Sequence, residues 1–95
     1  MIIAVDFDGT LEKCGKPDLV LIEHLKSQQR KGNTVILWTC RDGKRLKEAL
    51  NFLARYGFAP NLVNRNHPTA VRRMGHDPRK IYADLYIDDK GIRAF

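Results

Sequence analysis

The stretch from residue 2 to residue 11 constrains the fold of this chain more than any other segment. Four apolar residues lead directly into Asp6-Phe7-Asp8-Gly9-Thr10. A continuous apolar run of this kind is typical of a strand buried on both faces, as in the centre of a parallel sheet. Alternation along the strand places Asp6 and Asp8 on one side and Phe7 on the other. Two carboxylates at the end of a buried strand repel each other unless they share a proton or a cation, and a divalent metal ion is the simplest remedy.

Beyond this stretch the chain alternates apolar runs with segments of helical spacing. The apolar runs predict three further strands, at residues 34–38, 61–63 and 83–87. Apolar residues at helical spacing predict helices at residues 17–31, 46–54 and 68–74, with glycines as their stops. No repeat or linker divides residues 1–95, which we interpret as a single domain. This order predicts an α/β fold, a small doubly wound, Rossmann-like parallel sheet of about four strands with flanking helices.

Polar side chains follow the ends of all the predicted strands. They are Asp6 and Asp8, then Thr39, then Asn64, and finally Asp88 and Asp89. Ligands of doubly wound sheets bind at the carboxyl ends of the strands, so we expect these side chains to share one edge. A hard cation such as Mg²⁺, held by one or two carboxylates and several waters, would relieve the repulsion among the aspartates and recruit phosphate. Asp84 begins the last strand at the opposite edge and is interpreted as structural.

The residue types at this edge are those that phosphoryl transfer requires. One metal-bound carboxylate can act as a nucleophile through an aspartyl-phosphate, and its neighbour two residues on can act as acid and then as base. The Thr39 hydroxyl and a cation, from Lys80, Arg79 or Lys90, can hold the non-bridging oxygens. The pattern therefore favours an enzyme that acts on phosphate esters.

The motifs and their order resemble the haloacid dehalogenase-like (HAD) hydrolase superfamily. The resemblance rests on Asp6-Phe7-Asp8-Gly9-Thr10-Leu11 after an apolar strand, Thr39 after a second, and Ile87-Asp88-Asp89 closing a later one. It covers essentially the whole chain and implies an HAD-type fold and a Mg²⁺-dependent phosphatase. By this resemblance Asp6 is the nucleophile and a metal ligand, and Asp8 is the general acid/base whose backbone carbonyl also binds the metal. Thr39 binds the phosphoryl group, Lys80 supplies the stabilising cation, and Asp88 completes the metal shell with the help of Asp89.

Members of this superfamily usually select substrates with cap domains inserted after the first or the third strand. Both connections are short here, so the chain resembles a capless member. An open site of this type suits large phosphorylated substrates, or is closed by a second subunit. Exposed edge strands of a small sheet also favour a homodimer or higher oligomer.

Several other residues near the predicted edge are candidates for substrate contacts. Gly9 allows close approach of the backbone, and Thr10 follows it. Cys40, Arg41 and Arg65 come just after strands that end at the site, although Arg41 is equally well explained as part of an exposed helical turn. Two assignments stay open. Arg79 competes with Lys80, and Asp88 is favoured over Asp89 only because alternation turns Asp89 away.

The composition narrows the class of partner. The formal net charge of +6 points to an anionic substrate such as a nucleotide, a sugar phosphate or a polynucleotide end, or else serves solubility alone. Cys14 and Cys40 lack metal-binding spacing, and reduced thiols fit a cytoplasmic protein. No apolar run is long enough for a membrane span, and no signal pattern opens the chain. Phe7 and Trp38 are predicted to be core aromatics.

Two alternatives to a phosphatase use the same residues. A phosphotransferase would differ only in its acceptor, and Asp8 as a base for water favours hydrolysis. A catalytically silent module that binds phosphate or nucleic acid would show steep salt dependence, but binding alone gives no reason for both Asp6 and Asp8. A receiver-type signalling domain would need an aspartate after the third strand, where this chain has Asn64.

Overall fold

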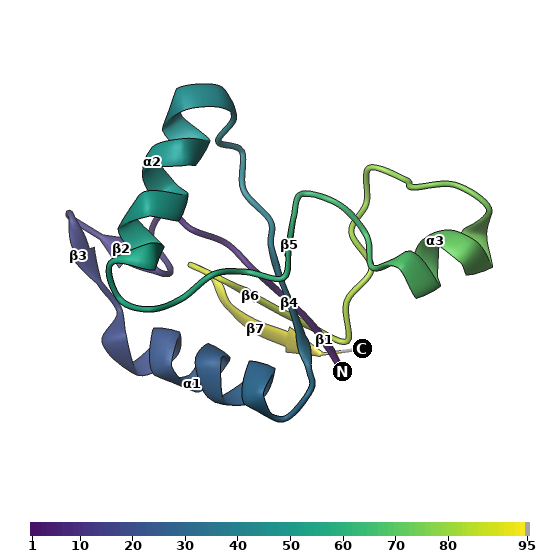
Figure 1. Ribbon diagram of the computed structural model, residues 1–95, viewed down its shortest axis with the longest axis horizontal. Helices are drawn as coiled ribbons and strands as arrows, with labels where there is room; N and C mark the ends of the chain where they lie inside the picture. The colour runs from purple at the N-terminus through teal and green to yellow at the C-terminus, as the bar shows by residue number, and fades with distance from the viewer. Residues whose placement is uncertain (95) are drawn as a thin grey trace.

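The computed structural model describes residues 1–94. In chain order the elements are β1 (Ile2–Val5), β2 (Glu12–Lys13), β3 (Lys16–Pro17), α1 (Leu19–Arg30), β4 (Thr34–Leu37), α2 (Gly43–Ala54), β5 (Leu62–Val63), α3 (Pro68–Met74), β6 (Leu85–Asp88) and β7 (Gly91–Ala94). All four predicted strands and all three predicted helices are present, which confirms the expected α/β fold (Figure 1).

The main sheet has five strands in the order β5-β4-β1-β6-β7. β1 lies between β4 and β6 and pairs with both in parallel, and β4 pairs in parallel with β5. β7 was not predicted, and it adds an antiparallel edge strand to β6. The strand order reverses at β1, because the chain first builds outward to β5 and then returns to place β6 on the other side. Such a switch point opens a crevice at the carboxyl ends of the strands.

Helices α1 and α2 cover one face of the sheet. Ile22 and Leu25 of α1, and Ala49 and Leu53 of α2, join Val5 in one buried cluster. Burying these side chains is the main favourable contribution to stability on this side of the sheet. The helices therefore hold β1 rigidly just before the acidic segment begins.

The segment between β5 and β6 covers the opposite face. Its residues Ile81 and Ala83 pack with Ala4 of β1 and Ile36 of β4 in a second, smaller buried cluster. Figure 1 shows α3 to one side of the sheet, not over its centre. This face consequently has a thinner cover than the one beneath α1 and α2.

Local sequence signals explain where the helices begin and end. The Asp18 side chain caps α1 by accepting a hydrogen bond from the Leu21 N–H at 3.1 Å. Nδ1 of His67 accepts from the Thr69 N–H at the start of α3, and Gly75 ends that helix with a φ of 80°. Within residues 1–94, no helix combines the length and the apolar character that a membrane span requires.

One aromatic prediction is confirmed and the other is wrong. Phe7 is buried, with 2% of its surface exposed, and packs edge to face against Phe52 of α2. Trp38 is 41% exposed, because it follows β4 on the thinly covered face, where its ring contacts that of Tyr86. An apolar run ending in tryptophan does not reveal that its last residue lies beyond the cover of the helices.

Candidate active site at the carboxyl edge of the sheet

Strand register brings the first and last acidic motifs together. Val5, the last residue of β1, pairs with Ile87 of β6, and the Asp6 N–H donates to the Ile87 carbonyl at 3.0 Å. Asp6 therefore lies beside Asp88 at the switch point between the two strands. This register places the aspartates that follow β1 and β6 at the same edge of the sheet, as the sequence predicted.

The turn formed by Asp6-Phe7-Asp8-Gly9 lies against Asp89 of the second acidic motif, Asp88-Asp89. Gly9 has a φ of +77°, and a Cβ built on it would lie 3.4 Å from the Cβ of Asp89. The Phe7 carbonyl accepts backbone hydrogen bonds from Thr10, Leu11 and Glu12, which closes the turn. The positive φ therefore favours glycine at this turn, whereas a Cβ there would meet Asp89 only at ordinary van der Waals distance.

Asp6 is the focus of the negative charge. Partial burial raises the pKa of the Asp6 carboxyl above its ordinary value. A hydrogen bond from the Phe7 N–H to Asp6 Oδ1, at 2.8 Å, opposes this rise. The negative charges of Asp8, Asp89 and Asp88 raise the pKa further. A cation bound among these groups would relieve the repulsion and hold Asp6 ionised.

Asp8 is paired with Arg41 instead of facing an open site. Nη2 of Arg41 lies 2.8 Å from Asp8 Oδ1, and Nε lies 3.0 Å from Oδ2. The guanidinium also stacks on Phe7, with Cζ 4.8 Å from the ring centroid. These hydrogen bonds lower the pKa of the Asp8 carboxyl, so that it is ionised near neutral pH. Arg41, which we expected to contact the substrate, contacts the acid/base candidate in this structure.

Replacing Arg41 by Gln should destabilise the fold by about 1 kcal/mol near neutral pH, a loss of several degrees in Tm. The depressed pKa of Asp8 contributes stability above the ordinary carboxyl pKa, and this contribution disappears as the pH falls through the lowered value. The difference from wild type should therefore shrink in acid, as measured by thermal unfolding at several pH values.

Arg55→Gln is the matched control, because Arg55 also stacks on a phenylalanine, with Cζ 5.4 Å from the Phe52 centroid, and is exposed. It should show no such pH dependence. If both variants lose the same stability at every pH, the ion pair with Asp8 contributes nothing.

Thr39 is positioned by the end of β5. Its N–H donates to Asn64 Oδ1 at 2.8 Å, and its Oγ1 accepts from the Arg41 N–H at 3.2 Å. A hydroxyl that accepts one hydrogen bond still has a proton to donate, so Thr39 remains able to bind a phosphoryl oxygen. Cys40 follows as an exposed free thiol.

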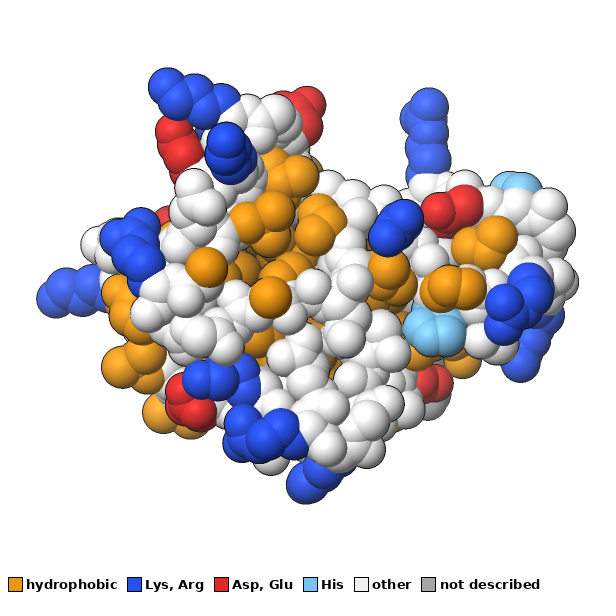
Figure 2. Space-filling model, viewed as in Figure 1, with side chains coloured by type: hydrophobic (Ala, Val, Ile, Leu, Met, Phe, Trp, Pro, Cys, Tyr) orange, Lys and Arg blue, Asp and Glu red, His pale blue; other side chains and the backbone are white. Residues whose placement is uncertain are grey.

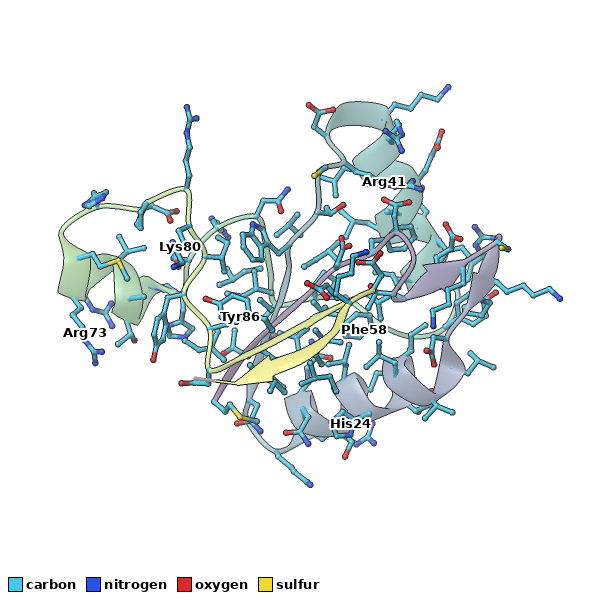
Figure 3. The ribbon with its side chains drawn as sticks, turned by 180° about the vertical axis from the view of Figure 1, so that it is seen from behind. His24, Arg41, Phe58, Arg73, Lys80 and Tyr86 are labelled. Carbon is cyan, nitrogen blue, oxygen red and sulfur yellow. The ribbon has the colours of Figure 1, made fainter. Side chains whose placement is uncertain are left out.

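Lys80 is not brought to the carboxylates. It lines a separate groove with Tyr86, and Figure 3 shows Lys80 on the loop next to α3, whereas Arg41 lies beside α2. Among the described residues, no hydrogen bond or ion pair joins the Lys80 side chain to an aspartate. Sequence order alone could not reveal this, because the path of the connection before β6 depends on tertiary contacts.

One predicted substrate contact, Thr10, also differs from expectation. Thr10 is only 4% exposed, and its hydroxyl has no hydrogen-bond partner within the described part of the chain. Burial makes it a structural residue of the turn in this conformation. Arg65 is exposed just after β5. Arg79, the alternative to Lys80, is exposed as well.

The +6 charge forms no single basic patch on the face seen in Figure 2, where Lys and Arg side chains are scattered around the outline.

Sequence reasoning missed Asn66, which is 3% exposed. Its Nδ2 donates to Asp77 Oδ1 at 2.9 Å and to the Pro78 and Lys80 carbonyls at 3.1 and 3.2 Å. Its Oδ1 accepts from the Tyr82 N–H. One buried amide thus shapes the loop that carries Lys80, and no local pattern in the sequence marks it.

The donors at the site fit Mg²⁺ if the set includes backbone oxygen. Among residues 1–94, no group of three or more His, Cys, Asp or Glu side chains is placed to hold a metal ion. The set implied by the resemblance needs only two carboxylates, from Asp6 and the Asp88–Asp89 pair, together with the Asp8 carbonyl. In the described chain that carbonyl accepts no hydrogen bond, and Asp88 uses only Oδ1, which accepts from the Lys90 N–H. Few protein ligands and several waters are typical of Mg²⁺.

Fold and site together define a small α/β protein with an acidic cluster at the switch point of its sheet. Among solved structures, a conserved protein from Bacteroides thetaiotaomicron is 34% identical, with a TM-score of 0.81, over 100% of this chain and 80% of that one. The chain belongs to the same family as that conserved protein. Neither the protein-family models nor the curated proteins contain a match. The likeness establishes the fold and the family, not an activity.

Proposed function

We propose that this protein is a Mg²⁺-dependent phosphatase of the HAD type, a phosphoric monoester hydrolase that forms an aspartyl-phosphate on Asp6. The observation that carries the proposal is the meeting of Asp6 and Asp8 with Asp88 and Asp89 at the switch point. Burial, with repulsion from the neighbouring carboxylates, raises the pKa of Asp6, and a divalent cation would relieve the repulsion and attract a phosphate ester. The cation would neutralise charge on the phosphoryl oxygens.

In the first step an Asp6 carboxylate oxygen attacks phosphorus, a P–O bond forms, and the bond to the leaving alkoxide breaks. In the second step water attacks the aspartyl-phosphate and releases inorganic phosphate. Asp8, held ionised by Arg41, is suited to accept the proton of that water. To donate a proton to the leaving alkoxide in the first step, Asp8 must separate from the guanidinium and be protonated. The carboxylate that this donation leaves then accepts the proton of the water in the second step.

Among the described residues, Arg41 is the cation that contacts Asp8, and we propose that it takes the role expected of Lys80. A bound phosphoryl group would compete with Asp8 for the guanidinium, which binds either anion in bidentate fashion. Such an exchange would hold the phosphoryl oxygens and release Asp8 for proton transfer at the same time. Thr39 would donate its hydroxyl proton to a third oxygen.

The test of the proposed function is a screen of phosphate monoesters with Mg²⁺ and with EDTA, scored by release of inorganic phosphate. We expect hydrolysis that depends on Mg²⁺ and returns when Mg²⁺ is restored after chelation. Transfer of labelled phosphate to an added alcohol in place of water would make the protein a phosphotransferase. Binding without turnover of any ester would leave only a silent phosphate-binding module.

Asp88→Asn and Asp89→Asn should each weaken Mg²⁺ binding by about 10- to 100-fold, as loss of a ligand or of its immediate support typically does. Mg²⁺ at about 100 times its Kd stabilises the wild type by about 2.7 kcal/mol, which raises Tm by roughly 10 °C. At the same Mg²⁺ concentration, we expect about half of this rise or more to be lost in both variants.

Asp84→Asn is the matched control, because Asp84 accepts the Ile2 N–H at the opposite edge of the sheet. It should keep the full stabilisation by Mg²⁺. Equal loss in all three variants would contradict a metal site at the switch point.

We also propose a cytoplasmic location and a phosphorylated nucleotide, sugar or polynucleotide end as substrate. Cys14 and Cys40 are both free, which suits a reducing compartment.

Assembly into a homodimer is proposed through β7, the edge strand that carries Ile92, whose side chain is 67% exposed. Sedimentation of the Ile92→Lys variant beside wild type tests this assembly.

A further inference from the structure

The single tryptophan of the chain lies next to the proposed nucleophile. Val5 pairs with Leu37 of β4, and the Trp38 N–H donates to the Val5 carbonyl at 2.9 Å. Trp38 and Asp6 are therefore neighbours across β4 and β1. Because Val5 and Leu37 belong to the core beneath α1 and α2, alternation places Trp38 and Asp6 on the opposite, thinly covered face.

Tyr86 extends this aromatic surface towards β6. Its ring centroid lies 5.7 Å from that of Trp38, with the planes tilted by 53°. β1 lies between the two rings. Its residue Ala4, which pairs with Tyr86 of β6, is small enough to let the rings meet above it. The Tyr86 hydroxyl donates to the Ile81 carbonyl and accepts from the Ala83 N–H at 3.0 Å. Both hydrogen bonds hold the Tyr86 ring in place, so the surface is preorganised.

A groove of about 380 Å³ continues from Tyr86. Its lining is mainly apolar and aromatic and includes one cation and no carboxylate: Met74, Pro78, Lys80, Ile81, Tyr82 and Tyr86. This volume lies within the usual range of small-molecule sites. Figure 3 shows Lys80 and Tyr86 together on this side of the molecule. Trp38 thus neighbours Asp6, and its partner Tyr86 lines the groove, so the aromatic pair links the two.

We propose that Trp38, Tyr86 and this groove bind the base of a nucleoside phosphate whose phosphoryl group reaches Asp6. The inference rests on the proposed function and names its substrate class. Flat aromatic bases stack on exposed aromatic side chains with little dependence on sequence. A sugar phosphate would need polar partners for its hydroxyls, whereas most of the groove lining is apolar. Lys80 then serves as a substrate contact at the base or at a neighbouring phosphate, away from the reacting phosphorus.

Fluorescence of Trp38 provides a direct test, because no other tryptophan contributes to the signal. Wild-type protein in EDTA, where turnover is suppressed, is titrated with adenosine, with adenosine monophosphate, with a short 5′-phosphorylated oligonucleotide and with glucose 6-phosphate. We expect the three ligands that contain a base to quench the fluorescence and glucose 6-phosphate to leave it unchanged. Tighter binding of the oligonucleotide than of the mononucleotide would identify a nucleic-acid end as the source of the base.

Calorimetric titration of variants separates stacking from folding. Trp38→Leu should weaken adenosine monophosphate binding by about tenfold, whereas Trp38→Phe should retain most of the affinity. Tyr56→Leu is the aromatic control, since Tyr56 packs on Phe52 in the other layer. In assays with Mg²⁺, Trp38→Leu should raise KM for the nucleotide by a larger factor than KM for glycerol 2-phosphate, which has no base to stack.

The outcomes distinguish this inference from the function on which it rests. Hydrolysis of glycerol 2-phosphate without quenching by any base would overturn the aromatic site and leave the phosphatase intact. Quenching by bases with no hydrolysis of any ester would support the binding site and contradict the phosphatase. Equal quenching by glucose 6-phosphate would overturn the assignment of a base.

Discussion

Replacing Asp6 by Asn is expected to reduce phosphate-ester hydrolysis by at least about 10³-fold, because the amide cannot form the acyl-phosphate on which both steps depend. The fold should be preserved, since Asp6 accepts a hydrogen bond from the Phe7 N–H through Oδ1 and the amide oxygen of Asn can do the same. Initial rates with Mg²⁺ and a panel of esters measure the loss.

The same substitution should raise Tm in the absence of metal. Burial and three neighbouring carboxylates raise the pKa of Asp6, so ionised Asp6 destabilises the folded state. Asn carries no charge and removes this destabilisation. A gain in metal-free stability together with a loss of activity is typical of a site arranged for function. Asp84→Asn, the same chemical change at the opposite edge, serves as the control. Full activity of Asp6→Asn would exclude the covalent mechanism.

Replacing Asn66 by Ala is expected to cost about 3 kcal/mol of stability, because it leaves the Tyr82 N–H and the Pro78 and Lys80 carbonyls without their partner. For a domain of this size the loss corresponds to a fall in Tm of at least about 10 °C. Thermal and urea unfolding measure it. Asn51→Ala, on the exposed surface of α2, should change stability by less than about 0.5 kcal/mol.

The Asn66 variant also separates the two halves of the proposed site. Asn66 holds the loop that lines the groove, whereas the aspartates are held by β1 and β6. Where the variant is still folded, nucleoside binding should weaken and stabilisation by Mg²⁺ should remain. An unchanged Tm would show that the loop does not depend on this amide.

Local pattern was sufficient for the four parallel strands, the three helices and the acidic edge. The apolar run before Asp6 predicts a buried central strand, and once β1 and β6 are parallel neighbours their carboxyl ends must meet. The cap at Asp18 and the stop at Gly75 are equally local, because each satisfies backbone groups of its own helix. The antiparallel β7 was missed because its four residues form a strand only by pairing with β6.

Contacts between distant residues decided the rest. The pairing of Arg41 with Asp8 joins residues 33 positions apart, and Asn66 holds the backbone of the loop that carries Lys80 from 14 positions away. Trp38 is exposed because α3 stands beside the sheet and does not cover its centre. Residue spacing determines which side of a strand a side chain occupies, whereas its partner and its access to solvent depend on how separate segments pack. The sequence thus determined where the acidic groups gather, and only the tertiary structure decided which cation and which aromatic rings lie beside them.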